Sequence, residues 1–207
     1  MKNKSSFLYI VPYLALFIPT PGRFVFGIVI ILEILILNFL GIFINALINK
    51  LKLQNIKTVI LVISMMTIAI LYRQIFIIFQ TNLALTLGYI FYLPPISLFT
   101  INFLFHETEK SVSERLKYSI PRISLFCGLG LLFFLFRDIV GFGTFTFFGK
   151  NHAIYEKIIF SSDSLGLFPF FASIPGALIL DGLILFLYTF IDNRFQILKN
   201  ADEDGLE

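Results

Sequence analysis

Long apolar stretches, separated by short polar segments, fill almost the whole chain. A helix needs about 20 apolar residues to cross a bilayer. The pattern therefore predicts an all-α integral membrane protein with about six transmembrane helices. The predicted spans are residues 7–19, 24–48, 56–71, 76–105, 118–136 and 167–191.

Prolines interrupt the first and the fourth of these stretches at corresponding places. Tyr9-Ile10 precedes Pro12 in the first stretch, and Tyr89-Ile90 precedes Pro94-Pro95 in the fourth. Broken spans at matching positions of two halves are typical of inverted repeats with a site at mid-membrane. We therefore expect a single membrane domain (1–200) with repeat halves of about 1–75 and 76–200, two broken helices, and an acidic tail (201–207). Chance similarity between two apolar stretches explains the same residues equally well.

Composition supports a membrane protein, since 57% of the residues are hydrophobic and only 14% are charged. The basic residues are scattered over short loops, which excludes a nucleic-acid-binding surface. A single cysteine, Cys127, excludes an internal disulfide and a thiolate-rich metal site within the chain. His106 and His152 fit solvated loop residues better than a metal-binding pair.

The distribution of basic residues predicts an orientation, because cytoplasmic loops of membrane proteins are rich in Lys and Arg. With six spans, one side carries Lys2, Lys4, Lys50, Lys52, Lys57, Lys110, Arg115, Lys117, Arg122, Arg194 and Lys199. The other side carries Arg23, Arg73, Arg137, Lys150 and Lys157. We expect a multi-pass protein of the inner (plasma) membrane with both termini in the cytoplasm.

Two carboxylates, Glu33 and Asp181, lie inside predicted spans. A charged side chain at the centre of a bilayer costs about 2.5–3.5 kcal/mol on insertion scales. Each carboxylate is therefore protonated, paired or exposed to a wet cavity. We predict an ion pathway that uses Glu33 and Asp181; a protonated acid that only bonds a neighbouring helix is the alternative for each.

Three sequence motifs carry a resemblance to a known family. The stretch Arg137-Asp138-Ile139-Val140-Gly141-Phe142-Gly143-Thr144 resembles the Arg-Glu-x-x-Gly-x-Gly-Thr stretch of the small six-span membrane subunits of Rnf-type and Nqr-type ion-translocating electron transport complexes. Ile174-Pro175-Gly176-Ala177 is similar to the family's Pro-Pro-Gly-Ala ending, and Leu93-Pro94 to its Leu-Pro-Leu-Ile broken helix. The spans and motifs together cover residues 7–193.

The resemblance implies an inverted 3+3 repeat, a homologous membrane subunit inserted in the opposite sense, and further subunits of the complex. In the family each subunit gives one cysteine from each half to an iron–sulfur centre at mid-membrane, and electron flow is coupled to sodium or proton movement. Here the two ligand positions are Ile18 and Thr100. We therefore expect no cofactor in this chain.

The segment that follows the fifth predicted span admits a structural role as well as one in ion access. Arg137-Asp138 is predicted to be an interfacial ion pair with a snorkelling arginine. The loop after it contains Gly141, Gly143, Thr144 and Gly149, and we expect this loop to shape access to the ion pathway.

Two other functional classes remain open: a small-solute or ion carrier built on the same inverted-repeat fold, and a structural or assembly factor of the membrane. No Ser/His/Asp or Cys/His arrangement indicates catalysis, so the chain is at most a non-catalytic subunit of an oxidoreductase complex.

Overall fold

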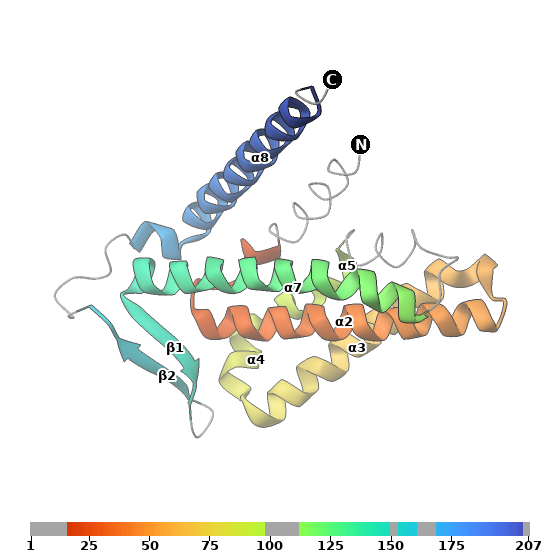
Figure 1. Cartoon of the computed structure of the whole chain (residues 1–207). Coiled ribbons are helices and arrows are strands. Elements are labelled where there is room, and N and C mark those ends of the chain that lie inside the picture. The colour runs from red at the N-terminus through yellow and green to blue at the C-terminus, as the bar shows by residue number, and fades with distance from the viewer. Residues whose placement is uncertain (1–15, 98–111, 150–152, 161–168, 205–207) are drawn as a thin grey trace.

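The computed structural model describes residues 16–97, 112–149, 153–160 and 169–204. Two long helices, α2 (Phe24–Lys50) and α3 (Lys57–Phe79), form an antiparallel hairpin through the short 3-10 turn η1 (Gln54–Ile56). A third helix, α7 (Val112–Phe136), lies along α2 and runs in the opposite direction (Figure 1). The predicted helical class is confirmed, and α7 contains the whole predicted fifth span.

Small residues allow α2 and α7 to approach closely. A Cβ atom added to Gly27 on α2 would lie 2.3 Å from the ring of Phe134 on α7. A Cβ atom added to Gly130 on α7 would lie 2.7 Å from the ring of Phe17, which precedes α2. Close backbone approach at glycine is the usual packing mode of helices in membranes, where apolar burial does not drive association.

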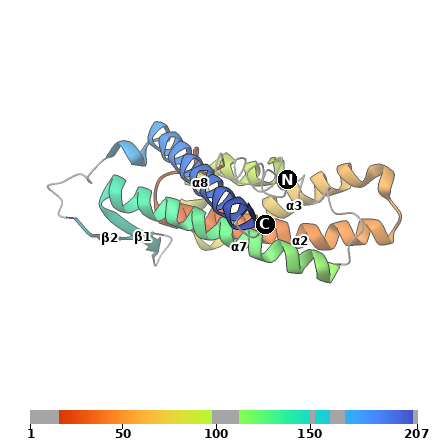
Figure 2. The same cartoon turned by 45° about the horizontal axis from the view of Figure 1, so that its top comes forward.

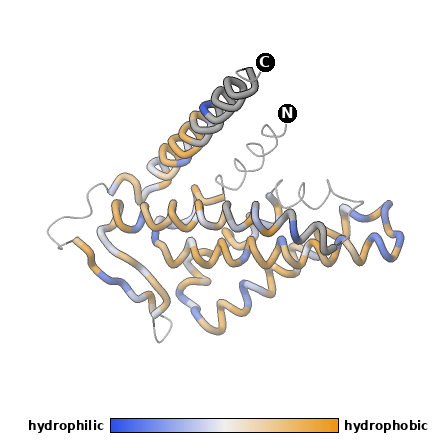
Figure 3. Tube along the Cα trace, viewed as in Figure 1, coloured by the Kyte–Doolittle hydropathy of each residue, from blue (hydrophilic) through white to orange (hydrophobic). Residues whose placement is uncertain are grey.

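Two helices are long and apolar enough to cross a membrane by length and composition, Phe24–Lys50 and Gln54–Phe79. Figure 3 shows apolar residues along both helices and polar residues at the turn that joins them. A shorter apolar helix covers Ile174–Leu187. These helices indicate a membrane protein, and the described residues do not show six spans or an inverted repeat.

The third and fourth predicted spans have the wrong boundaries. Helix α3 continues to Phe79, and the chain then folds back against α3 in three short pieces. These pieces are α4 (Thr81–Leu87), η2 (Gly88–Tyr92) and α5 (Leu93–Ile96). Gly88 has a positive φ of 45°, which ends α4, and Pro94 and Pro95 cannot donate the backbone bonds of a longer helix. Residues 1–15, with most of the first predicted span, and Thr100 lie outside the described residues.

An antiparallel β-hairpin follows α7, so the all-α prediction is wrong for this segment. Helix α7 ends in the π-helical turn η3 (Arg137–Phe142), and Gly143, with φ of 69°, turns the chain into strand β1 (Thr144–Phe148). Strand β2 (Ile154–Ile158) pairs with it, with Thr146 opposite Glu156. Phe and Thr residues favour extended structure, which explains why the backbone forms strands here.

The last helix, α8 (Ile174–Asp204), follows the short turn η4 (Pro169–Ala172). It projects away from the other helices in Figure 1 and crosses in front of them in Figure 2. It begins later than the predicted sixth span and continues into the segment predicted as a tail. Helices α2 and α3 therefore lie side by side as a hairpin, whereas α8 projects away from α7 (Figure 1).

Candidate functional site

Arg137 is enclosed at the end of α7 and is 1% exposed. Its guanidinium donates hydrogen bonds to five main-chain carbonyl oxygens from two distant segments. The acceptors are Phe17 (3.3 Å), Thr20 (3.0 Å), Phe171 (3.2 Å), Ala172 (3.0 Å) and Ser173 (3.4 Å). Burial lowers the pKa of Arg137 to about 10, so the guanidinium stays charged at neutral pH. A planar group with five N–H donors suits this role, and no other side chain offers as many.

Asp138 is fully buried and accepts hydrogen bonds from another set of groups. The backbone N–H of Phe24, the first residue of α2, donates to its Oδ2 at 3.1 Å. Thr146 donates to the same oxygen from its backbone N–H (2.8 Å) and its hydroxyl (2.6 Å), and the Thr144 hydroxyl donates to Oδ1 (2.9 Å). A carboxylate at the first N–H group of a helix is favoured by both hydrogen bonding and the helix dipole.

The predicted interfacial ion pair of Arg137 and Asp138 is therefore wrong. Both side chains are buried, and each bonds to its own partners. Arg137 binds the carbonyls of Phe17 and Thr20 in the non-helical segment that precedes α2, and Asp138 binds the N–H group of Phe24, where α2 begins. Such carbonyl and N–H groups have no partner within a helix. The two neighbouring charged side chains thus provide hydrogen-bond partners for main-chain groups before α2 and at its first residue. They also tie this segment to strand β1 and to turn η4.

A second, exposed contact joins the hairpin to α2. Arg23 forms an ion pair of 3.0 Å with Glu156 on β2. The Val25 N–H donates to the Thr146 hydroxyl at 3.3 Å. Both contacts hold the hairpin over the start of α2.

Close packing and backbone conformation explain why glycine occupies these positions of the predicted access loop. A Cβ atom on Gly141 would lie 2.9 Å from the backbone of Ala172, and one on Gly149 would lie 2.7 Å from the carbonyl oxygen of Ala153. Gly143 adopts a left-handed conformation. The structure thus brings Gly141, Gly143 and Thr144 next to Asp138 and η4, and places Gly149 at the far end of β1. A role of this loop in access stays a prediction.

Asp181 is 5% exposed on the side of α8 that faces the other helices. Arg137 interacts with it electrostatically. Within the described residues its Oδ1 atom has no hydrogen-bond partner.

Glu33 is 1% exposed in the first half of α2. Within the described residues neither of its carboxylate oxygens has a hydrogen-bond partner. Tyr72 on α3 lies within electrostatic reach of it, and the Tyr72 hydroxyl donates to the carbonyl oxygen of Val29 at 2.8 Å. The described structure shows no contact between Glu33 and Asp181, so the two predicted ion-pathway residues belong to separate environments.

The donor set does not fit an iron–sulfur centre. Ile18 packs against the main apolar core and has no donor atom for a metal. Cys127 is buried on α7, and the described residues contain no cluster of three His, Cys, Asp or Glu side chains.

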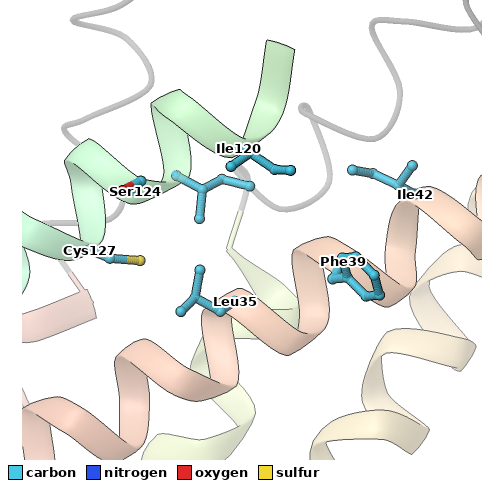
Figure 4. A pocket seen from close by; sticks show the side chains of 7 residues that line it. Leu35, Phe39, Ile42, Ile120, Ser124 and Cys127 are labelled. Carbon is cyan, nitrogen blue, oxygen red and sulfur yellow. The ribbon is translucent and has the colours of Figure 1, made fainter. Parts of the chain in front are cut away.

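Cys127 borders an apolar cavity of about 210 Å³ between α2 and α7. Leu35, Phe39 and Ile42 from α2 and Ile120, Ile123, Ser124 and Cys127 from α7 line the cavity (Figure 4). Its apolar lining carries no group suited to binding an ion.

No known family model matches the chain. No curated protein matches its sequence.

Thr146 is a further residue of this site that was not predicted from the sequence, and the surroundings of Arg137 and Asp138 differ from those predicted. A signal was present, since two adjacent opposite charges directly followed an apolar span and preceded a Gly-x-Gly-Thr segment. Charges in such a place are buried only where the fold supplies partners.

Proposed function

We propose that the chain is a divergent integral membrane subunit of an Rnf/Nqr-type ion-translocating electron transport complex. It would form six spans as an inverted 3+3 repeat in the inner membrane, with both termini in the cytoplasm. It would pair with a homologous subunit inserted in the opposite sense, and any electron carrier would be held by its partners. Two apolar helices of spanning length and the buried Arg137–Asp138 arrangement in the family-like motif support this proposal.

The observation that carries the ion-translocating role is the isolated carboxylate of Glu33. An acidic side chain buried in an apolar helix without a partner is costly, and in membrane proteins such residues usually belong to ion or proton pathways. Asp181 is the second candidate, because its carboxylate is buried near the charged Arg137. In this proposal residues 141–149 shape the access to these carboxylates.

The complex is tested by purifying the tagged protein from its own membranes in a mild detergent and identifying the bound proteins by mass spectrometry. We expect stoichiometric recovery of a homologous membrane subunit and of redox subunits. Recovery of the chain alone would remove the electron-transport role.

The ion role is tested by flux measurements on proteoliposomes that contain the isolated complex. Glu33→Gln and Asp181→Asn should abolish ion flux, whereas Glu156→Gln, which alters an exposed residue, should not. Full flux in both buried variants would sink the proposed ion pathway.

One observation favours a carrier that works without redox partners. Ile18 has no ligand atom, so this half of the family's cluster site is missing from the chain, while Glu33 keeps the features of an ion-binding residue. Ion flux by the purified chain alone would support this second function. A structural or assembly role would give neither flux nor redox partners.

A further inference from the structure

Glu33 lies deep within its helix. It is the tenth residue of the 27-residue helix α2, which places it about 13 Å along the helix axis from Phe24. Its buried neighbours on α2 include Val29, Ile30 and Ile34. Water outside the membrane is therefore not available to stabilise a negative charge at this position.

The elements packed against α2 bring few titratable groups toward Glu33. From α3, Tyr72 is within electrostatic reach, but its hydroxyl is directed to the Val29 carbonyl oxygen. Arg73, on the same helix, donates to the Tyr92 hydroxyl at 3.2 Å, and Lys57 is at the opposite end of α3. Cys127 on α7 borders the apolar cavity beside Leu35. Arg137, directly after α7, donates to main-chain carbonyls that precede α2, such as that of Thr20. Within the described residues, neither carboxylate oxygen of Glu33 accepts a hydrogen bond.

A metal cation and a proton make different demands on such a site. Hard cations bind several oxygen ligands, about six or more for Ca²⁺ and six for Mg²⁺. The described residues contain no group of three or more His, Cys, Asp or Glu side chains that could hold a metal ion, and the two Glu33 oxygens have no hydrogen-bond partner there. A proton needs only the carboxylate itself, because the protonated acid is neutral and can be buried in apolar surroundings.

We infer that Glu33 takes up a proton and does not bind a metal cation such as sodium. This inference rests on the proposed ion-handling role of Glu33 and names the ion at that site. Any metal-cation site in the complex would then lie elsewhere.

The test is infrared spectroscopy of the purified full-length chain in lipid at neutral pH. The carbonyl stretch of a protonated carboxylic acid is compared between the wild type and Glu33→Gln, with Glu156→Gln as the control for an exposed carboxylate. We expect a band that is lost in Glu33→Gln, retained in Glu156→Gln, and identical in sodium and choline salts. Absence of a Glu33-dependent band, or its loss when sodium replaces choline, would overturn the inference.

A second measurement reads the same property chemically. Apolar carbodiimides modify protonated carboxylic acids within membranes, and mass spectrometry locates the adduct. We expect modification of Glu33 that declines as pH rises and is unchanged by sodium at fixed pH. Protection by sodium would contradict a proton site.

The outcome is separable from that of the proposed function. If the purification recovers no redox partners but the Glu33 band is present, the complex is wrong and the proton site stands. If partners are recovered and flux occurs while the band is absent, the proton assignment alone fails.

Discussion

At the residue scale, two adjacent side chains of opposite charge organise one end of the molecule. Arg137 donates its hydrogen bonds to carbonyl oxygens, and Asp138 accepts hydrogen bonds from N–H and O–H groups. Hydrogen bonds to buried charged groups contribute about 1.5–3 kcal/mol each. The pair thus stabilises the non-helical segment before α2, where main-chain N–H and carbonyl groups would otherwise lack these hydrogen-bond partners.

We predict that Asp138→Ala lowers the free energy of unfolding by about 3–5 kcal/mol, because it leaves the Phe24 and Thr146 N–H groups buried without an acceptor. The chain has no tryptophan, but Cys127 is buried, so a thiol-reactive dye reports thermal unfolding in detergent. Glu156→Gln is the matched control and should cost less than about 1 kcal/mol, since its ion pair is exposed. Equal shifts in both variants would contradict the buried role of Asp138.

Arg137→Lys should also destabilise the protein, by about 1–3 kcal/mol. An ammonium group has three donors and no planar fork, so it cannot serve both segments that the guanidinium joins. Arg73→Lys is the control, because Arg73 donates one hydrogen bond to the Tyr92 hydroxyl and a lysine ammonium can replace that donor. The same dye measurement compares the two, and an unchanged melting temperature in Arg137→Lys would show that charge alone is sufficient.

The burial of Glu33 and Asp181 could be predicted from the sequence, since each is surrounded by apolar neighbours in the chain. The environment of Arg137 and Asp138 could not. Their partners at residues 17–24 are more than 110 positions away, and local pattern carries no information on such contacts.

At the scale of elements, the α2–α7 interface depends on where glycine lies along α7. Gly130 faces Phe17 and Ile31, whereas a Cβ atom added to Gly128 would meet nothing within 4 Å. The two positions are on one helix, which makes them a matched pair.

We predict that Gly130→Ala destabilises the protein by about 1–3 kcal/mol through overpacking. Gly128→Ala should be neutral or stabilise it by up to about 1 kcal/mol, because alanine is the better helix former. Thermal unfolding of both variants decides the matter. Similar shifts in the two would mean that α7 does not pack on α2 as described.

Helix positions were predicted best where an apolar run is long and uninterrupted, as in α2 and α7. The pieces that follow α3 were not, because Gly88 and the prolines break the helix without interrupting the apolar pattern. The β-hairpin was missed for the same reason: five successive Phe and Thr residues suit a strand as well as a membrane interface.

At the scale of the whole molecule, different basic residues lie at the two ends of the helix bundle. The α2–α3 turn with Lys50 and Lys52 lies at one end, and Arg23 with the β-hairpin lies at the other (Figure 1). This agrees with the two groups of basic residues that the sequence distinguishes, while the choice of cytoplasmic side stays a prediction.

We predict that single cysteines at these two ends react from opposite sides of the membrane. In a Cys127→Ser background, Lys52→Cys should react with an impermeant maleimide only in inverted vesicles, and Lys157→Cys only in intact cells or spheroplasts. Lys52 lies in the turn and Lys157 on β2, and both are outside the apolar helices. Labelling of both from one side would show that α2 does not cross the bilayer.

The reach of Arg137 and Asp138 across the sequence has a consequence for biosynthesis. The groups that they satisfy, at Phe17, Thr20 and Phe24, leave the ribosome more than 110 residues before their partners do. The first turn of α2 is therefore synthesised before the groups that cap it, and its hydrogen bonds are completed only after residues 137 and 138 have been made.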